Sequence, residues 1–233
     1  MGGLQVSQEG AVVRAILDLG AENLLDGSTT VQLTELLTDP PSGARLLRLG
    51  AAGEAFCLGR ERAAETPEEL RQEVGRLVAL NRALAASSLV TVAEVPGDAA
   101  GFGVGLVALA DVAVAAAGVR FWFPEVEIDL APVVVLTWLP RMVGRRTAFE
   151  LTATGRRVTA EEALHLGLVN AVAEDRTKLA STVEDWVDRL LGFSGRVHGE
   201  IKDYLRAAQD LDEGHAYELA LTRLVLGSMR RRR

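Results

Sequence analysis

The stretch GDAAGFGVGLVALAD, residues 97–111, places four glycines between two β-prone runs, residues 89–95 and 112–116. Glycines at such a junction let the backbone turn tightly and approach a ligand closely. The first N–H groups of a helix that starts here have no acceptor within the helix and lie at the positive end of its dipole. An oxygen that gains negative charge would be stabilised there. Taken alone, the pattern is also typical of a glycine turn that only packs a helix against a sheet.

The composition describes a chain that can fill one sizeable hydrophobic core. It has 233 residues, which suits one large domain or a domain with an appendage, and 48% of them are hydrophobic. The formal net charge of −7 argues against a general nucleic-acid binder. No apolar run is long enough to span a bilayer, and the first residues lack the basic and apolar regions of a secretion signal. We therefore expect a cytoplasmic protein without a membrane or nucleic-acid partner.

Cysteine and histidine usage disfavours disulfides and metal sites. The single cysteine, Cys57, excludes an internal disulfide framework and suits a small buried hydrophobe. For the three histidines, His165, His198 and His215, we credit no second histidine, cysteine or carboxylate as a partner at metal-ligand spacing. We therefore expect no metal.

Strand and helix patterns alternate up to Val172, and only helices follow. Asp26, Thr66 and Thr159 are placed as N-caps, and Thr66 and Thr159 precede the acids that such caps favour. The expected strands are a hairpin over residues 6–18 and single strands over residues 45–49, 89–95, 112–116 and 170–172. The expected helices cover residues 28–37, 66–86, 159–167, 179–191, 198–208 and 212–229, with one more after the glycine stretch. This alternation predicts an α/β fold.

A series of motifs in a fixed order resembles one known family. The motifs are AFCLGR (55–60), the glycine stretch, FPEV (123–126), LPRMVG (139–144), TGRRVTAEEA (154–163) and GLVN (167–170). Their order and spacing resemble the crotonase superfamily, the enoyl-CoA hydratase/isomerase family, from about Val6 to about Leu226. The resemblance implies a spiral of ββα units in residues 1–172. It also implies a helical region, residues 173–233, that builds a trimer and closes over coenzyme A (CoA).

The chain ends in four consecutive arginines, residues 230–233. A run of like charges is usually disordered, and we expect that here. The alternative is that the arginines lie near the phosphates of CoA.

The resemblance further implies two backbone N–H donors for the oxygen of a CoA thioester. The first is the N–H of Arg60, which follows Gly59. The second is the middle position of a glycine trio in the family. Here the trio reads Gly101-Phe102-Gly103, so the donor is the N–H of Phe102, although the family tends to have no side chain there. A register slip of one residue would assign Gly101 or Gly103 instead.

Hydratases of this family carry two glutamates, and this chain matches one of them. Position 105 is a glycine, and Glu125 matches the second glutamate. Glu127 is expected to share a strand face with Glu125 and Asp129 to fall in the following turn, so both are interpreted as structural. A glutamate placed at Gly105 is expected to restore some hydration if residues 133–136 leave room for water. It is also expected to gain stability, because glycine is unfavourable inside a helix.

Further residues are assigned to substrate or CoA contact through the same resemblance. They are Cys57, Leu58, Gly59, Arg62, Gly101, Gly103, Gly105, Trp122, Pro132, Val133 and Lys202. Arg60 and Arg62 are equally consistent with a solvated charge cluster that includes Glu61 and Glu65, and Lys202 with a surface lysine. The aliphatic stretch over residues 133–136 is equally consistent with a simple change in core packing.

A single carboxylate in a dry pocket suits the movement of a double bond. One base can take a proton from C2 and return it at C4. The residues expected to form dry walls that bring the pKa of this carboxyl toward neutrality are Phe121, Trp122, Phe123, Val133 and Trp138. We therefore expect Glu125 to be the acid/base of an isomerase that converts 3-enoyl-CoA to 2-enoyl-CoA in lipid metabolism.

The same resemblance sets the expected partners and the alternatives. A CoA thioester is expected as substrate, with no permanently bound cofactor, in a homotrimer or a dimer of trimers. One alternative is a hydratase, dehydratase or decarboxylase of a biosynthetic pathway. The other is a non-catalytic subunit that keeps the fold, which a filled pocket behind the ring of Phe102 would favour.

Overall fold

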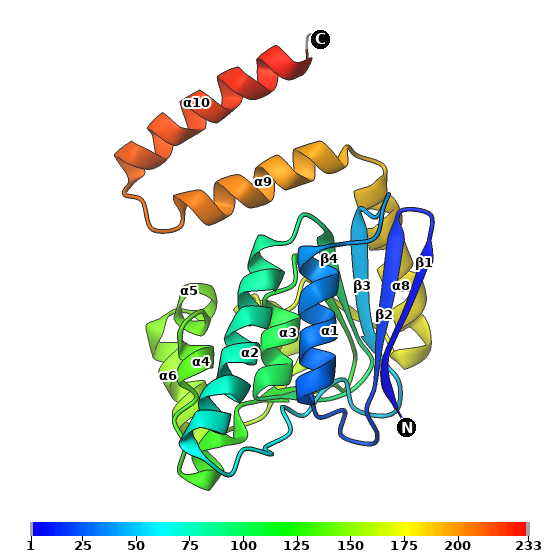
Figure 1. Cartoon of the computed structure of the whole chain (residues 1–233), viewed down its shortest axis with the longest axis vertical. Coiled ribbons are helices and arrows are strands. Elements are labelled where there is room, and N and C mark those ends of the chain that lie inside the picture. Colours follow the sequence, from blue (N-terminus) through cyan, green and yellow to red (C-terminus); the bar gives the residue numbers. More distant parts are fainter. Residues whose placement is uncertain (1, 232–233) are drawn as a thin grey trace. The chain divides into compact units, whose positions relative to one another are not determined.

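The computed structural model describes residues 2–231 and divides into two compact units, with the boundary after Gly192. The first unit contains two β-sheets and the helices that pack on them (Figure 1). The second contains α9 (Gly195–Ala208) and α10 (Glu213–Arg231). The predicted α/β class and the predicted C-terminal helices are confirmed.

The larger sheet has six strands and the smaller has three. In spatial order the larger sheet contains β1 (Gly3–Glu9), β2 (Val12–Asp18), β3 (Leu46–Ala51), β4 (Val90–Val95), β6 (Val112–Ala116) and β9 (Ala171–Ala173). The smaller contains β5 (Ala99–Ala100), β7 (Arg120–Trp122) and β8 (Val158–Thr159). The hairpin β1–β2 is antiparallel and the remaining pairs of the larger sheet are parallel, which requires crossover connections.

Helices supply these crossovers. The helices of the first unit are α1 (Gly27–Thr38), α2 (Pro67–Ala86), α3 (Phe102–Ala108), α4 (Val133–Leu136), α5 (Leu139–Val143), α6 (Arg145–Thr154), α7 (Ala160–Leu166) and α8 (Arg176–Leu191), of which α8 follows the last strand. A 3₁₀ helix, η1 (Pro124–Ile128), follows β7. In Figure 1, α1, α2 and α3 lie side by side, and contacts join α1 to α2 and α2 to α3.

Successive turns of the chain repeat one pattern, which is the predicted spiral of ββα units. Strand β3 of the larger sheet leads to Cys57, which bridges Ala99 of the smaller sheet, and then to α2. Strand β4 leads in the same way to β5 and α3. Strand β6 leads to β7 and the helices that follow. Each turn therefore passes from the larger sheet to the smaller one and returns through a helix.

Local capping signals explain where several helices begin. The side chain of Asp26 accepts a hydrogen bond from the N–H of Thr29 at 2.6 Å. Thr66 and Glu69 form a reciprocal capping box in front of α2. Thr159 accepts from the N–H of Glu162 at the start of α7. These three predicted helix starts are confirmed.

Helix α8 belongs to the first compact unit, so the units divide after Gly192 and not after Val172. It packs on β4, β6 and β9. Arg48 of β3 is buried and pairs with Glu94 of β4 at 2.7 Å and with Glu184 of α8 at 2.8 Å. This ion-pair network joins α8 to the sheet through the exposed Glu184.

The second unit is a pair of helices. The hydroxyl of Tyr204 in α9 donates to the carbonyl of Ala216 in α10 at 3.1 Å. Arg230 and Arg231 of the C-terminal arginine run fall within α10. Arg232 and Arg233 lie outside the described residues.

Candidate active site

The glycine stretch forms a tight turn that leads from β5 into α3. Gly101 has φ of +51°, a left-handed conformation that favours glycine, and its N–H donates to the carbonyl of Trp122 at 2.9 Å. A Cβ at Gly103 would lie 2.0 Å from the carbonyl oxygen of Cys57. Glycine at 103 thus lets the segment that carries Cys57 lie directly against α3.

Phe102 begins α3, so its N–H has no acceptor inside the helix. Among the described residues, no hydrogen bond from this N–H is found. Helix α3 is buried over its whole length, which excludes solvent from its sides. The backbone donor predicted at Phe102 therefore lies at the end of a fixed element.

The segment before Arg60 runs along the glycine stretch. The N–H of Ala100 donates to the carbonyl of Cys57 at 2.9 Å, and Gly59 has φ of +127°. On the opposite edge, the N–H of Leu25 donates to Gly59 and the carbonyl of Leu25 accepts from Glu61. Because both neighbours of Arg60 bond to Leu25, the N–H of Arg60 itself points away from Leu25.

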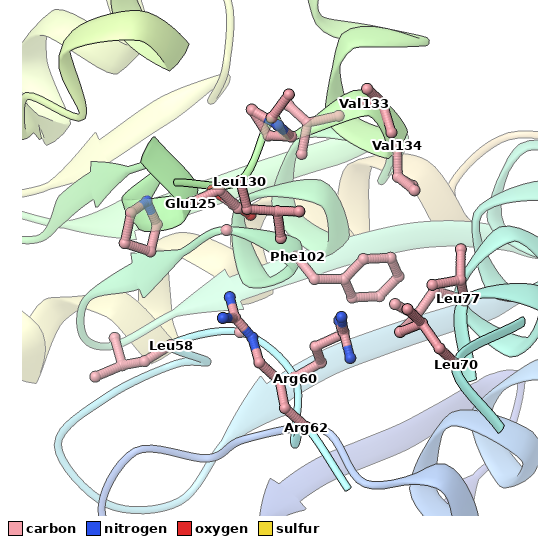
Figure 2. Close-up of a pocket in the computed structure, with 17 residues that line it drawn as sticks. Leu58, Arg60, Arg62, Leu70, Leu77, Phe102, Glu125, Leu130, Val133 and Val134 are labelled. Atoms are coloured by element: carbon pink, nitrogen blue, oxygen red, sulfur yellow. The ribbon is translucent and has the colours of Figure 1, made fainter. Parts of the chain in front are cut away.

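Glu125 lies beside these two backbone segments. A Cβ at Gly101 would be 2.8 Å from Oε1 of Glu125, so the carboxyl group sits over the turn that leads to Phe102. Figure 2 shows Glu125 and the side chains of Arg60 and Arg62 around one cavity. Gly101 thus makes room for the carboxyl group.

The predicted strand around Glu125 is wrong. Pro124–Ile128 is the 3₁₀ helix η1, and Asp129 ends it with φ of +56°. A proline at the first helical position favours this start. In a helix with three residues per turn, Glu127 does not share a face with Glu125, and its side chain is exposed.

Burial raises the pKa of Glu125 above that of an ordinary glutamate, and the guanidinium groups of Arg62 and Arg60 act against this rise. Its Oε2 atom is buried and has no hydrogen-bond partner among the described residues. A carboxyl group of this kind is suited to exchange a proton with a bound substrate.

The cavity has a volume of about 210 Å³ and a mostly aliphatic lining. Leu58, Gly59, Arg60, Arg62, Gly101, Phe102, Glu125, Pro132 and Val133 are predicted site residues that the structure brings together here. The remaining lining residues are Leu70, Val74, Leu77, Pro124, Leu130, Ala131, Val134 and Val135. The space beside the ring of Phe102 is therefore open, and the filled pocket that would have favoured a non-catalytic subunit is not found there.

Other predicted site residues do not line this cavity. Cys57 is fully buried, its thiol donates to the carbonyl of Gly59 at 3.1 Å, and burial raises its pKa to about 12. Gly103 and Gly105 lie inside α3. Lys202 belongs to α9 in the second unit.

The aromatic walls predicted for the pocket are wrong. Phe121, Phe123 and Trp138 are buried in the core, and the guanidinium of Arg157 lies 4.5 Å from the ring centre of Trp122. The walls are formed by aliphatic residues of α2 and of the segment 130–135 instead. The expected aliphatic wall at Val133 is thus present without these four rings, and the aromatic ring that does line the cavity is that of Phe102.

Helix α2 supplies wall residues that the sequence did not assign to the site. Leu70, Val74 and Leu77 follow the helical spacing of an apolar face, which predicts contact with the core. Leu70 is 45% exposed, which a core position would not be. The sequence feature that could have indicated this wall is the apolar face of α2, which continues into the first, charged turn of the helix.

Over residues 2–231, no group of three histidine, cysteine or acidic residues is placed to hold a metal ion. Within the same range, no helix combines the length and apolar character needed to cross a bilayer.

The amino-acid sequence matches one family model over most of its length. Residues 22–225 match the model described as enoyl-CoA hydratase/isomerase. The chain belongs to the enoyl-CoA hydratase/isomerase family.

Members of this family resemble the chain in sequence at modest identity. A carnitinyl-CoA dehydratase of Proteus mirabilis is 27% identical over 224 residues, which cover 93% of this chain and 85% of that protein. An enoyl-CoA hydratase of Alternaria alternata is 31% identical over 195 residues, 82% of this chain. The match spans only 65% of the length of the Alternaria protein.

Solved structures of the family share the fold. An enoyl-CoA hydratase of Mycobacterium smegmatis superposes with a TM-score of 0.91 at 29% identity, over 97% of this chain and 91% of that one. A putative enoyl-CoA hydratase of Thermobifida fusca in complex with CoA gives a TM-score of 0.87 at 23% identity, over 98% and 94% of the two chains. The predicted crotonase-type fold is confirmed.

Proposed function

We propose that this protein is an acyl-CoA double-bond isomerase that converts a 3-enoyl-CoA to a 2-enoyl-CoA. The observation that carries the proposal is that Glu125 is the one carboxylate among the described residues that line the cavity. It lies beside the turn that presents the N–H of Phe102, and the segment with the N–H of Arg60 lines the same cavity.

The proposed reaction uses one base twice. The thioester oxygen accepts hydrogen bonds from the N–H groups of Arg60 and Phe102, and each such donor is worth about 10² to 10³ in rate. The C2–H bond breaks, its proton moves to Glu125, and negative charge spreads onto the thioester oxygen. The double bond then forms between C2 and C3 while Glu125 returns the proton to C4. No water is consumed.

Hydration is the competing reaction, and the named relatives include hydratases. Addition of water to a 2-enoyl-CoA needs an activated water and a proton at C2, which two carboxylates share in the hydratases of the family. Position 105 offers no carboxylate here. The test is to supply the purified protein separately with a 3-enoyl-CoA and a 2-enoyl-CoA. Conversion of the first without hydration of the second supports the isomerase, and fast hydration of the second would show that the proposal is wrong.

The remaining contacts and the assembly are also proposals. A CoA thioester binds as substrate, without a permanently held cofactor, and Arg62 and Lys202 contribute to CoA binding. A homotrimer or a dimer of trimers is the proposed assembly, and light scattering of the purified protein measures it directly.

The pH dependence should report Glu125. The base must be deprotonated, so kcat/KM falls as the pH drops through the pKa of this carboxyl, which burial places above the ordinary range. The Arg62 guanidinium lowers that pKa. Arg62→Gln is therefore expected to move the acidic limb of the kcat/KM profile to higher pH. Arg71→Gln, an exposed arginine of α2, is the control and should leave the limb in place. If the acidic limb of the kcat/KM profile keeps its position in Arg62→Gln, Arg62 does not influence the pKa of Glu125.

The ring of Phe102 should limit the length of the acyl group. The ring lines the cavity together with Leu70 and Leu77 (Figure 2), and truncation to alanine keeps the backbone N–H. Phe102→Ala is expected to raise the ratio of kcat/KM for a longer over a shorter 3-enoyl-CoA by about tenfold, since one methylene in a pocket is worth about 10- to 200-fold. The control is Phe149→Ala, because Phe149 is 72% exposed and does not line the cavity. An equal ratio in both variants would contradict the assignment.

A further inference from the structure

One carboxylate of α2 holds the loop that follows Arg60. The side chain of Glu73 is 13% exposed. Its Oε2 accepts hydrogen bonds from the N–H of Ala63 at 3.3 Å and of Ala64 at 3.1 Å. Its Oε1 forms an ion pair with the guanidinium of Arg60. A single half-buried carboxylate thus binds the loop at three points.

These contacts complement those of Leu25 on the other edge of the segment. Leu25 bonds to the carbonyl of Gly59 at 3.0 Å and to the N–H of Glu61 at 2.9 Å. Leu25 therefore holds the peptide groups on both sides of Arg60. Glu73 holds the side chain of Arg60 and the loop that follows it. The direction of the N–H of Arg60 has little freedom left.

The geometry also separates the roles of the two arginines beside the cavity. The guanidinium of Arg60 is engaged by Glu73, whereas no ion pair of Arg62 is found among the described residues. A small cavity of about 50 Å³ lies beside the pair and is lined by Arg60, Glu61, Glu73 and Arg76, among others. The loop therefore has space to shift if the carboxylate is removed.

We propose that Glu73 is a positioning residue that fixes the N–H of Arg60 for the thioester oxygen. The inference rests on the proposed function, in which this N–H is one of two donors. An oxyanion donor acts only when it lies about 2.7–3.1 Å from the position of the developing charge. Loss of Glu73 should therefore weaken stabilisation of the enolate and leave the rest of the CoA site in place.

The test uses acetoacetyl-CoA, whose enolate has its own ultraviolet absorption band and needs no reaction at Glu125. Wild-type protein is expected to increase the enolate fraction of the bound ligand. Glu73→Ala should lower the enolate-forming constant by about tenfold or more, the scale of a misplaced oxyanion donor. Free CoA, measured by calorimetry, should bind both proteins equally. Glu68→Ala is the matched control, because Glu68 is an exposed glutamate of the same helix whose side chain bonds to Gln72.

Two more measurements make the outcome decisive. Hydrogen exchange at the amides of Ala63 and Ala64 should be faster in Glu73→Ala than in wild type. Glu73→Gln keeps an oxygen acceptor for both amides and should restore slow exchange and most of the enolate band. If the alanine variant does not fold, Glu73→Gln is the variant used for the exchange and enolate measurements.

The outcomes separate this inference from the proposed function. Equal enolate bands in Glu73→Ala and Glu68→Ala would overturn the positioning role alone. Absence of an enolate band in wild type would overturn the proposed oxyanion hole. In that case unchanged amide exchange at Ala63 and Ala64 in Glu73→Ala would also overturn the loop contact.

Discussion

Replacement of Glu125 by glutamine is expected to lower kcat for the isomerisation by about 10³-fold, within the range for loss of a general acid/base. Glutamine keeps the size of the side chain, and the neighbouring Gly101 still leaves room for it. It cannot take the proton from C2. The measurement is the appearance of 2-enoyl-CoA from 3-enoyl-CoA at saturating substrate, with CoA binding as a check that the site is intact.

The same substitution should not destabilise the protein. The raised pKa of Glu125 means that the folded protein disfavours the charged form, so the neutral amide is expected to keep or raise Tm at neutral pH. Glu127→Gln is the control for both readouts, because Glu127 is an exposed member of the same 3₁₀ helix. If Glu125→Gln turned over substrate at close to the wild-type rate, Glu125 would not be the base, and a loss of rate in Glu127→Gln would assign the role to Glu127.

Much of the fold could be predicted because its signals are local. The caps at Asp26, Thr66 and Thr159 each depend on a residue three places away, and all three mark helix starts in the structure. The strand over residues 112–116 has the predicted bounds. The family motifs then placed these elements in a spiral that periodicity alone does not specify.

The position of Glu125 could be predicted from the motif, but its surroundings could not. The run Phe121–Phe123 is β-prone, yet Pro124 starts a 3₁₀ helix directly after it. The rings of Phe121 and Phe123 are used in the core, so aliphatic residues from elsewhere in the chain face the carboxyl group. Which apolar residue faces a cavity depends on how the spiral turns stack, and no local pattern records it.

Glu73 is a polar residue whose contacts also could not be predicted from the sequence. In the sequence it is one of several glutamates in the first turns of a charged helix. Its contacts with Arg60, Ala63 and Ala64 depend on how the loop returns along α2. A carboxylate near a loop that carries an assigned backbone donor is the signal to look for once the fold is known.

Gly105→Glu is expected to destabilise the protein and not to restore hydration by itself. Gly105 is buried within α3, and a Cβ there would lie 3.5 Å from Cζ2 of Trp138. The rest of a glutamate would have to pass the buried indole, and Gly105 does not line the cavity. The gain in helix propensity, about 1 kcal/mol, is outweighed by the burial of a carboxylate. The buried surroundings of position 105 therefore argue against the gain in stability expected from helix propensity alone.

The expected loss is about 3 kcal/mol, or a decrease in Tm of roughly 6–12 °C, measured by calorimetry. Gly105→Ala is the control, since its Cβ would make only an ordinary contact with the indole and it should keep or raise Tm. Nε1 of Trp138 is buried without a hydrogen-bond partner among the described residues, so it could bind part of the new carboxylate and reduce the loss. A stable Gly105→Glu protein would indicate that it does.

The double variant Gly105→Glu, Trp138→Ala tests whether hydration is prevented by lack of room beside Trp138 or by lack of a second carboxylate. Removal of the indole frees space beside position 105 for the new carboxylate, because the indole is the group that a Cβ at this position would meet. If the new carboxylate then reaches the cavity, it can share a water molecule with Glu125. Slow hydration of a 2-enoyl-CoA is expected in this variant and not in Trp138→Ala alone. Rapid hydration by Gly105→Glu with Trp138 intact would mean that the indole moves aside, and that position 105 alone separates the proposed isomerase from a hydratase. No hydration in a folded double variant would mean that the aliphatic wall over residues 130–135 also excludes the water that a hydratase needs.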